Sequence, residues 1–583
     1  MTLVRGTAFV ETEPGGASFV WQDSTIRRHL GKAWANCDAW PNRTGDDDMR
    51  RATGILGIAL ATVTMSAASA AQRVKVAEGV LDGARIAAAA EPAAPAALPV
   101  DTYLGIPYAA PPTGALRWQP PRSVAKWSGV RKADRFGSRC MQQPLFADMR
   151  FRSPGIAEDC LTLNVWTPAG AKPGARLPVL VYIHGGGAVA GDGSELRYDG
   201  AAMARRGIVV VTINYRLGVF GFLATPELAA ESPVHAAGNY GLLDQAAALA
   251  WVRRNAAAFG GDAKRITIAG ESAGSMSVSV LMTSPLTRDT FAGAIGESGG
   301  VMPPTFHPKS LAQAQTDGET FAQAAGATSL ATLRAMPADA LLAAQGRQRI
   351  GADFIVDGVF LTETPLATYA GGRAARVPLL VGANSQEGSW TGVLNGAAPT
   401  VANYRAALTR IHGSDAEAVS ALYPARSDAD VPVAATALAS DTFLGASTWQ
   451  WFDLHRATRQ PTYYYYFAHP RPAALPPLTN PAIPPIGAVH SAEIEYALGN
   501  LDTNPAYAWT ADDRRISAVF QGYVAAFVKT GDPNAAGLPA WTAAPSGTGP
   551  ILRQTINVTT AARPFVEQAR YVAAVPLLDR RPR

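Results

Sequence analysis

The chain has 583 residues, of which 48% are hydrophobic and 17% are charged. This composition suffices for a large buried core and excludes a wholly disordered chain. The 51 Lys and Arg residues exceed the 46 Asp and Glu residues by only 5, and no basic run is present, so the sequence predicts no nucleic-acid partner.

A secretory signal peptide is predicted at residues 49–70. Met49 and two arginines precede an uncharged apolar stretch, 55–65, and small residues follow up to Ala70. A short basic segment, an apolar segment and a small-residue cleavage site are typical of such a signal. Cleavage is expected after Ala70.

The predicted signal peptide starts 48 residues after the first residue of the sequence. Because a signal peptide begins a chain, Met49 is interpreted as the initiator and residues 1–48 as an upstream misreading. The alternative is that Met1 is the start and residues 52–70 form a membrane anchor. The favoured interpretation predicts a secreted or periplasmic protein with a mature chain, 71–583, that is one domain without a stable membrane partner.

Cysteine spacing bears on metals and disulfides. Cys37, Cys140 and Cys160 form no CxxC pair and lack the spacing of a zinc site, so no metal is predicted, and no cofactor is indicated. Cys37 lies in the predicted upstream extension. In an oxidising compartment the remaining two are the natural pair for a disulfide.

Short apolar or β-branched runs alternate with helical patterns in the mature chain. Runs typical of buried strands occupy 179–183, 208–212, 265–269 and 377–381, an Ala-rich helix is predicted at 242–258, and residues 87–99 are a low-complexity surface insertion. Strands alternating with helices predict a mostly parallel sheet covered on both faces. Catalytic groups in such sheets cluster beyond the carboxyl ends of the strands.

The third of these runs leads directly into a G-x-S-x-G motif, Gly270–Gly274, and a helical pattern follows at 275–282. A sharp turn between strand and helix projects the central hydroxyl above the sheet. The alternative is a chance Gly/Ser turn, but the flanking strand and helix favour Ser272 as a nucleophile.

A serine nucleophile needs donors for the oxyanion that it forms. The sequence His-Gly-Gly-Gly, 184–187, follows the first run, and the predicted donors are the amides of Gly186, Gly187 and Ala273. His184 is an alternative general base, but its place beside the glycines favours a role in orienting the loop.

The general base is expected after the acid, in the order Ser, acid, His. His490 ends a Pro-rich loop, 470–488, and precedes a helical pattern, 491–498, so it can reach over the sheet edge. The other downstream histidines, at positions 307, 412, 455 and 469, are weaker candidates.

The acid is predicted at Glu387, just beyond the fourth run, where a carboxylate can fix the tautomer of an imidazole. Asp357 and Asp441 are the rivals. Asp357 precedes a glycine and suits a turn, whereas Asp441 suits a helix cap.

These motifs resemble those of the type-B carboxylesterase/cholinesterase family of α/β-hydrolases, from about Val74 onward. Further matching segments lie at 103–109, 158–165, 214–218, 238–245 and 531–534. The resemblance implies an α/β-hydrolase fold, with a mostly parallel central sheet flanked by helices and a large helical and loop insertion region over the active site.

The resemblance also implies roles for particular residues. It implies a Ser272, Glu387 and His490 triad that forms an acyl-enzyme, and a disulfide between Cys140 and Cys160. Ser298 and Glu493 are expected as indirect partners of the histidine, acting through a neighbouring side chain.

The sequence departs from the family pattern at several positions. Gln386 stands where an Asp usually precedes the acid, and Glu297 stands where a Gln is usual, which adds a charge near the site. Residues 141–159 lack the tryptophan with which cholinesterases bind quaternary ammonium groups, so choline esters are not the first expectation. Four further side chains are candidates for an acyl pocket or for ordinary core: Phe151, Met302, Phe306 and Trp390.

The sequence therefore predicts a secreted serine hydrolase that cleaves small-molecule carboxylic esters. The alternatives are a lipase, a peptidase or a catalytically silent, cholinesterase-like binding module. Neither the preferred ester nor the oligomeric state can be read from the sequence.

Overall fold

The computed structural model describes residues 71–87, 98–348, 353–479, 481 and 483–580. The predicted upstream extension, the signal peptide and most of the low-complexity insertion lie outside these residues.

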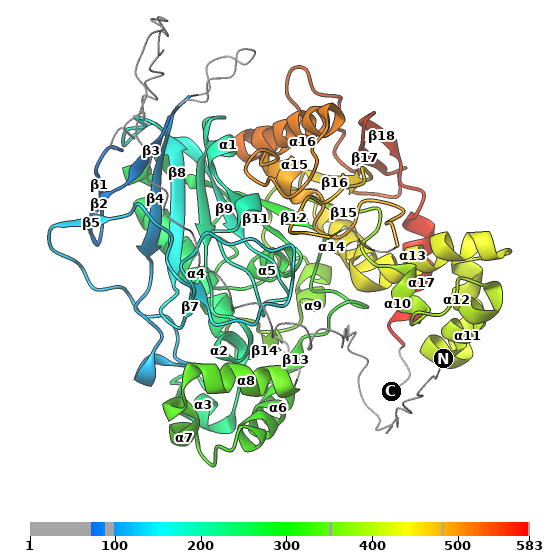
Figure 1. The fold of residues 1–583 in the computed structure, drawn as a ribbon, viewed down its shortest axis with the longest axis horizontal. Coiled ribbons are helices and arrows are strands. Elements are labelled where there is room, and N and C mark those ends of the chain that lie inside the picture. Colours follow the sequence, from blue (N-terminus) through cyan, green and yellow to red (C-terminus); the bar gives the residue numbers. More distant parts are fainter. Residues whose placement is uncertain (1–70, 88–97, 349–352, 480, 482, 581–583) are drawn as a thin grey trace, which may run out of the picture. The chain divides into compact units, whose positions relative to one another are not determined.

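An 11-stranded mixed sheet organises the described residues (Figure 1). Its parallel middle consists, in spatial order, of β10 (Val209–Ile213), β9 (Leu177–Ile183), β11 (Gly261–Glu271), β12 (Gly293–Glu297), β15 (Leu379–Asn384), β16 (Thr462–Phe467) and β17 (Leu552–Ile556). Antiparallel strands extend it at both edges: β8 (Thr162–Pro168), β4 (Val100–Pro107) and β3 (Ala84–Ile86) beyond β10, and β18 (Ala561–Pro564) beyond β17. The four runs predicted as strands are β9, β10, β11 and β15, and the predicted fold class is confirmed.

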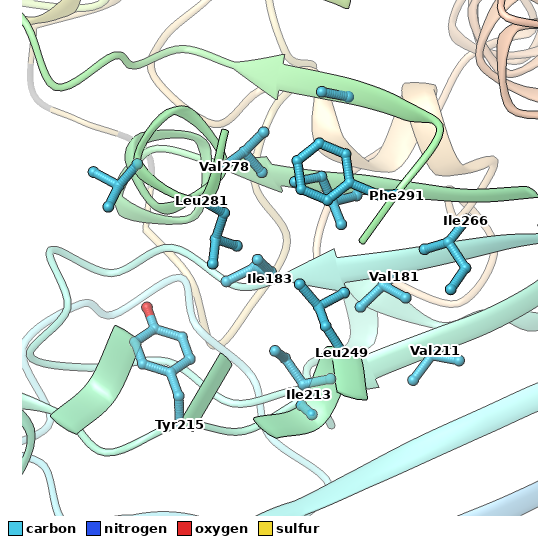
Figure 2. Close-up of a cluster of buried hydrophobic side chains, with 14 of the residues drawn as sticks. Val181, Ile183, Val211, Ile213, Tyr215, Leu249, Ile266, Val278, Leu281 and Phe291 are labelled. Atoms are coloured by element: carbon cyan, nitrogen blue, oxygen red, sulfur yellow. The ribbon is translucent and has the colours of Figure 1, made fainter. Parts of the chain in front are cut away.

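Side chains of β9 show how both faces of the sheet are covered. Figure 2 shows Val181 and Ile183 packed among side chains from α4 (Tyr240–Asn255) and α5 (Ala273–Leu281). Successive side chains of a strand point to opposite faces, so Leu180 belongs to a second cluster. Each fully buried Val, Leu or Ile contributes about 1.5–3 kcal/mol, so the two layers fix the strands that carry the site.

The second face is covered by α1 (Ala201–Ala204), α15 (Ile494–Leu498) and α16 (Ala511–Thr530). Smaller elements surround the sheet: β1 (Val74–Val76), β2 (Gly79–Asp82), β5 (Val130–Lys132), β6 (Arg139–Cys140), β7 (Ile156–Ala157), α2 (Gly218–Phe222), β13 (Lys309–Ser310), β14 (Ile355–Val356) and α9 (Pro365–Ala370). Nowhere in the described residues is a helix both long and apolar enough to cross a membrane.

Two groups of helices are inserted after the carboxyl ends of strands (Figure 1). One packs around its own apolar cluster and contains α3 (Pro226–Glu231), α6 (Leu311–Ala324), α7 (Leu330–Ala335) and α8 (Ala338–Gln348). The other contains α10 (Trp390–Val393), α11 (Val401–His412), α12 (Ala416–Leu422), α13 (Val431–Ser440) and α17 (Gln568–Leu578). The predicted helical insertions therefore exist and have hydrophobic cores of their own.

The interpretation of Asp441 as a helix cap is wrong. A π-helical turn, Asp441–Gly445, joins α13 to α14 (Ala446–Arg456), so the residue lies within a continuous helical segment. Its buried carboxylate accepts a hydrogen bond from the guanidinium of Arg570 at 2.8 Å and another from the hydroxyl of Tyr423 at 3.0 Å. The role of Asp441 is therefore determined by Arg570, which lies 129 positions away in the sequence.

Candidate active site

Ser272 lies at the sharp turn between β11 and α5, with φ 56° and ψ −122°. Such a backbone conformation costs a non-glycine residue about 1–3 kcal/mol and needs compensating contacts. Its N–H donates to the Glu297 carbonyl at 2.8 Å, and its own carbonyl accepts from Met276 at 2.9 Å. A Cβ on Gly274 would lie 2.1 Å from the carbonyl oxygen of Ile183, so the motif requires its glycine there.

The glycine loop after β9 passes directly beside this turn. A Cβ added to Gly185 would lie 3.1 Å from the Cβ of Ser272, and Gly186 and Gly187 have φ of 91° and 64°. Among the described residues, no group accepts a hydrogen bond from the amides of Gly186, Gly187 or Ala273. Three free donors at this turn are what an oxyanion hole requires.

His184 is a packing residue of the same loop. Its ring is buried and stacks on Tyr215 with a centroid distance of 4.5 Å, and the Tyr215 hydroxyl donates to the His184 carbonyl at 3.0 Å. Its Nδ1 lies 3.0 Å from the Gly185 carbonyl oxygen, so Nδ1 carries the proton. Burial lowers the pKa of His184 to about 4, so the ring is neutral and orients the loop.

His490 and Glu387 meet across 103 positions of sequence. Nδ1 of the imidazole lies 2.7 Å from Oε2 of the carboxylate, which follows β15 and is buried. The backbone amide of Asn384, the last residue of β15, donates to Oε1 of Glu387 at 2.6 Å. The strand end thus fixes the carboxylate, and the carboxylate fixes the imidazole tautomer.

The other nitrogen of His490 faces the residue before the predicted nucleophile. Nε2 lies 3.3 Å from Oε1 of Glu271, and no hydrogen bond between Ser272 and His490 is present in the described part of the chain. Burial works against the charged imidazole, but the carboxylates of Glu271 and Glu387 outweigh it and raise the pKa of His490 to about 9. Hydrogen bonds of this kind often tighten only when substrate is bound.

Ser298 contacts the acid that pairs with His490, and Glu493 contacts Ser298, so both residues are linked to the histidine indirectly. The Ser298 hydroxyl lies 2.6 Å from Oε1 of Glu387 and 3.0 Å from Oε1 of Glu493. A hydroxyl has one proton to donate, so one of the two carboxyl groups must be protonated. Burial, followed by the charge of Glu387, raises the pKa of Glu493, which therefore donates to Ser298.

A fourth buried carboxyl group lies beneath the same turn. Glu297 is the register partner of Glu271 in the neighbouring strand. Burial is the main cause that holds the pKa of Glu297 well above its usual range. The sequence predicted an added charge here, but the structure indicates a neutral acid. Within the described residues, these side chains are not arranged to hold a metal ion.

The rival candidates have other contacts. The Asp357 carboxylate accepts from three following backbone amides, as expected of a turn. Three rival histidines have partners elsewhere: His307 with Asp579 at 2.7 Å, His455 with the Val377 carbonyl at 2.9 Å, and His469 with Asp513 at 2.8 Å.

Two residues of the site were not predicted from sequence. The amide oxygen of Gln386 accepts from the backbone amides of Ile486 and Gly487 at 2.7 and 2.9 Å, which joins β15 to the Pro-rich loop before His490. The ring of Phe443, 45% exposed, lies nearly perpendicular to the ring of His490 with a centroid distance of 5.3 Å. Phe443 was missed because patterns of buried residues do not identify an exposed aromatic side chain. For Gln386, the signal in the sequence was its departure from the family pattern.

Three of the four candidates for an acyl pocket pack against neighbouring side chains. Met302 is fully buried in the main core, and Phe306 packs on Phe354 with a centroid distance of 5.2 Å. Phe151 lies under the guanidinium of Arg139. For these three residues packing is the better interpretation.

The predicted disulfide between Cys140 and Cys160 is present. It closes the segment 141–159, hereafter the disulfide loop. Cε of Met149 in this loop lies 3.0 Å from where a Cβ on Gly186 would be, so the loop reaches the glycine loop.

The sheet, the strained serine turn and the paired histidine and glutamate define an α/β-hydrolase. Residues 70–571 match the carboxylesterase family. Fumonisin B1 esterase of Sphingopyxis macrogoltabida is 39% identical over 418 residues, which cover 69% of this chain and 72% of that protein. Acylcarnitine hydrolase of Mus musculus and cocaine esterase of Homo sapiens are each 33% identical, covering 76% of this chain and 81% of each relative. The chain belongs to the carboxylesterase family and is a carboxylic ester hydrolase.

Proposed function

We propose that the protein hydrolyses esters through a triad of Ser272, His490 and Glu387 and an acyl-enzyme intermediate. The observation that carries this proposal is the 2.7 Å contact between Nδ1 of His490 and Glu387. The same imidazole has its Nε2 3.3 Å from Glu271, the neighbour of Ser272 in sequence, so the base lies at the serine turn.

In the first half of the reaction, the Ser272 hydroxyl attacks the ester carbonyl carbon while Nε2 of His490 takes its proton. The amides of Gly186, Gly187 and Ala273 stabilise the resulting oxyanion, and each such donor typically contributes about 2.7–4 kcal/mol. The C–O bond to the alcohol then breaks, and the alcohol leaves with the proton from the imidazole.

In the second half, water replaces the alcohol. His490 takes a proton from water, the hydroxide oxygen attacks the acyl carbon, and the bond to Ser272 breaks as its oxygen regains the proton. Glu387 accepts the Nδ1–H hydrogen bond throughout and stabilises the imidazolium.

The nucleophile is tested by Ser272→Ala. We expect p-nitrophenyl butyrate hydrolysis to be abolished while circular dichroism and thermal unfolding stay as in the wild type. A fluorophosphonate should label the wild type on the peptide containing Ser272 and should not label the variant. An unchanged rate, or a label on another serine, contradicts the proposed role.

The relatives are named for different esters, so the preference of this chain needs its own measurement. We propose small-molecule carboxylic esters as substrates. A panel that varies acyl length and alcohol, and that includes a long-chain triacylglycerol emulsion, distinguishes this class from a lipase. A rate on emulsion above that on all soluble esters contradicts the proposal.

We also propose that the protein is secreted after cleavage behind Ala70. The support is the signal pattern at 49–70 together with a disulfide, which persists in oxidising compartments. Edman sequencing of the exported protein should begin at Ala71. An N-terminus upstream of Met49 contradicts this proposal.

A further inference from the structure

The loop that carries His490 is held at the next residue by two guanidinium groups. Ser491 has φ 63°, a left-handed conformation that a non-glycine residue keeps only when its surroundings impose it. Arg471 donates to the Ser491 carbonyl at 2.5 Å, and Arg197 donates to the Ser491 hydroxyl at 3.3 Å. These contacts act directly beside the imidazole.

Arg197 also holds the disulfide loop. Its side chain is only 4% exposed, and one terminal nitrogen donates to Oδ2 of Asp148 at 2.9 Å and to the Asp148 carbonyl at 3.3 Å. Its Nε donates to Glu195 at 2.6 Å. One buried cation therefore connects Asp148 of the disulfide loop to Ser491 of the histidine loop.

The disulfide loop in turn contacts the oxyanion side of the site. Met149, the residue after Asp148, lies against Gly186. Arg152, four residues after Asp148, makes a second and separate connection to the protein body, with Asp199 at 2.6 Å and the Ser194 carbonyl at 2.9 Å. Of these two arginines, Arg197 is the one that also contacts the loop carrying His490.

We propose that Arg197 is a positioning residue for catalysis, which sets the place of His490 by holding Ser491 against Asp148 of the disulfide loop. This inference rests on the proposed role of His490 as general base. Arg197 acts through its neighbours and does not touch the reacting atoms. Removing one partner of a buried ion pair also destabilises a protein, so thermal unfolding of the variant is measured beside its rate.

The test compares Arg197→Met with the matched control Arg152→Met, which removes the other arginine that ties the disulfide loop to the same segment. For p-nitrophenyl butyrate, Arg197→Met should lower kcat by about 10- to 100-fold, because a displacement near 1 Å has an effect of that size. KM should stay within about threefold of wild type in both variants, and kcat of Arg152→Met should do so as well, since a partly exposed ion pair contributes little.

Arg197→Lys should recover part of the lost kcat, because a lysine keeps the charge but cannot hold two partners in a fixed fork. A wild-type kcat in Arg197→Met overturns the inference, as does an equal loss of kcat in Arg152→Met. If Arg197→Met does not fold, Asp148→Asn removes the partner charge at nearly constant volume, and an unchanged kcat in that variant overturns the inference.

His490→Ala separates this inference from the proposed triad. A large loss of rate in His490→Ala with a wild-type rate in Arg197→Met means that only the inference fails. An unchanged rate in His490→Ala means that the triad fails and the inference with it.

Discussion

Two sides of the active site are held by different kinds of contact. On the strand side, Ser272 and Glu387 follow β11 and β15 and are fixed by backbone hydrogen bonds at 2.8 and 2.6 Å. On the loop side, His490 follows a Pro-rich segment and is held through the side chains of Gln386, Arg197 and Arg471. The strand side depends on the sheet, whereas the loop side depends on individual polar side chains.

Substitutions should therefore have different effects on the two sides. On the strand side, a substitution that adds atoms within the turn should lower activity strongly. On the loop side, removal of one side chain should lower activity only in part, because other side chains still hold the loop.

On the strand side, Gly274→Ala should lower kcat by about 100-fold, because the serine turn must widen and a shift near 1 Å has about this effect. The added methyl group would lie 2.1 Å from the Ile183 carbonyl oxygen. Steady-state kinetics and thermal unfolding measure the outcome. As a control, Gly549→Ala adds a methyl group in an exposed loop whose contacts lie beyond 3.5 Å. Wild-type kcat and stability in Gly274→Ala would contradict the steric account.

Between the two sides, Glu271→Gln should move the acid limb of the kcat/KM profile to lower pH. The base must be neutral, so kcat/KM falls as pH decreases through the pKa of His490, which is about 9 with both carboxylates present. Removing one neighbouring negative charge lowers such a pKa by about one to three pH units. A limb that stays in place or moves to higher pH contradicts this assignment of charges.

On the loop side, Gln386→Ala should lower kcat by about 10-fold. The amides of Ile486 and Gly487 lose their acceptor, and the buried amide of Gly487 is left unsatisfied, which costs about 1–3 kcal/mol. Gln386→Glu keeps the acceptor oxygens and should retain more activity. The measurement is kcat at saturating ester. Equal activity of the alanine variant and the wild type would show that the Pro-rich loop needs no such connection.

The smallest effect is expected for Glu493→Gln. Because Glu493 is inferred to be a neutral hydrogen-bond donor to Ser298, an amide can replace it and kcat should change by less than about threefold. Glu493→Ala leaves the Ser298 hydroxyl without this donor and should be slower than Glu493→Gln. A loss in Glu493→Gln as large as in the alanine variant would mean that Glu493 is ionised.

The same contrast explains how far the sequence could predict the structure. Runs such as Val209–Val211 and the glycines around Ser272 express local rules of strands and tight turns, so the strands and the nucleophile turn are readable. The place of Glu387 at a strand end was predictable, because it lies three positions after Asn384, the last residue of β15. His490 was favoured by its place in chain order and before a helix.

Contacts between distant side chains were not predictable in the same way. The role of Asp441 depends on Arg570, and the Ser298 hydroxyl reaches Glu387, 89 positions away. The local sequence favoured a helix cap for Asp441. It indicated no partner for Ser298. Gln386 acts through a loop and Phe443 lies in a π-helical turn, and no periodic pattern in the sequence specifies the path of either segment.

The helices α10, α11, α12 and α13 are inserted between Glu387 and His490 in the chain, yet their core is separate from the sheet core. Evolution can therefore lengthen, shorten or remodel the core of this segment, provided that the contact of Ser440 in α13 with Gly388 beside the strand end is kept. Changes in ester selectivity among descendants of this scaffold should accumulate there, as a module that diverges while the reaction centre stays the same.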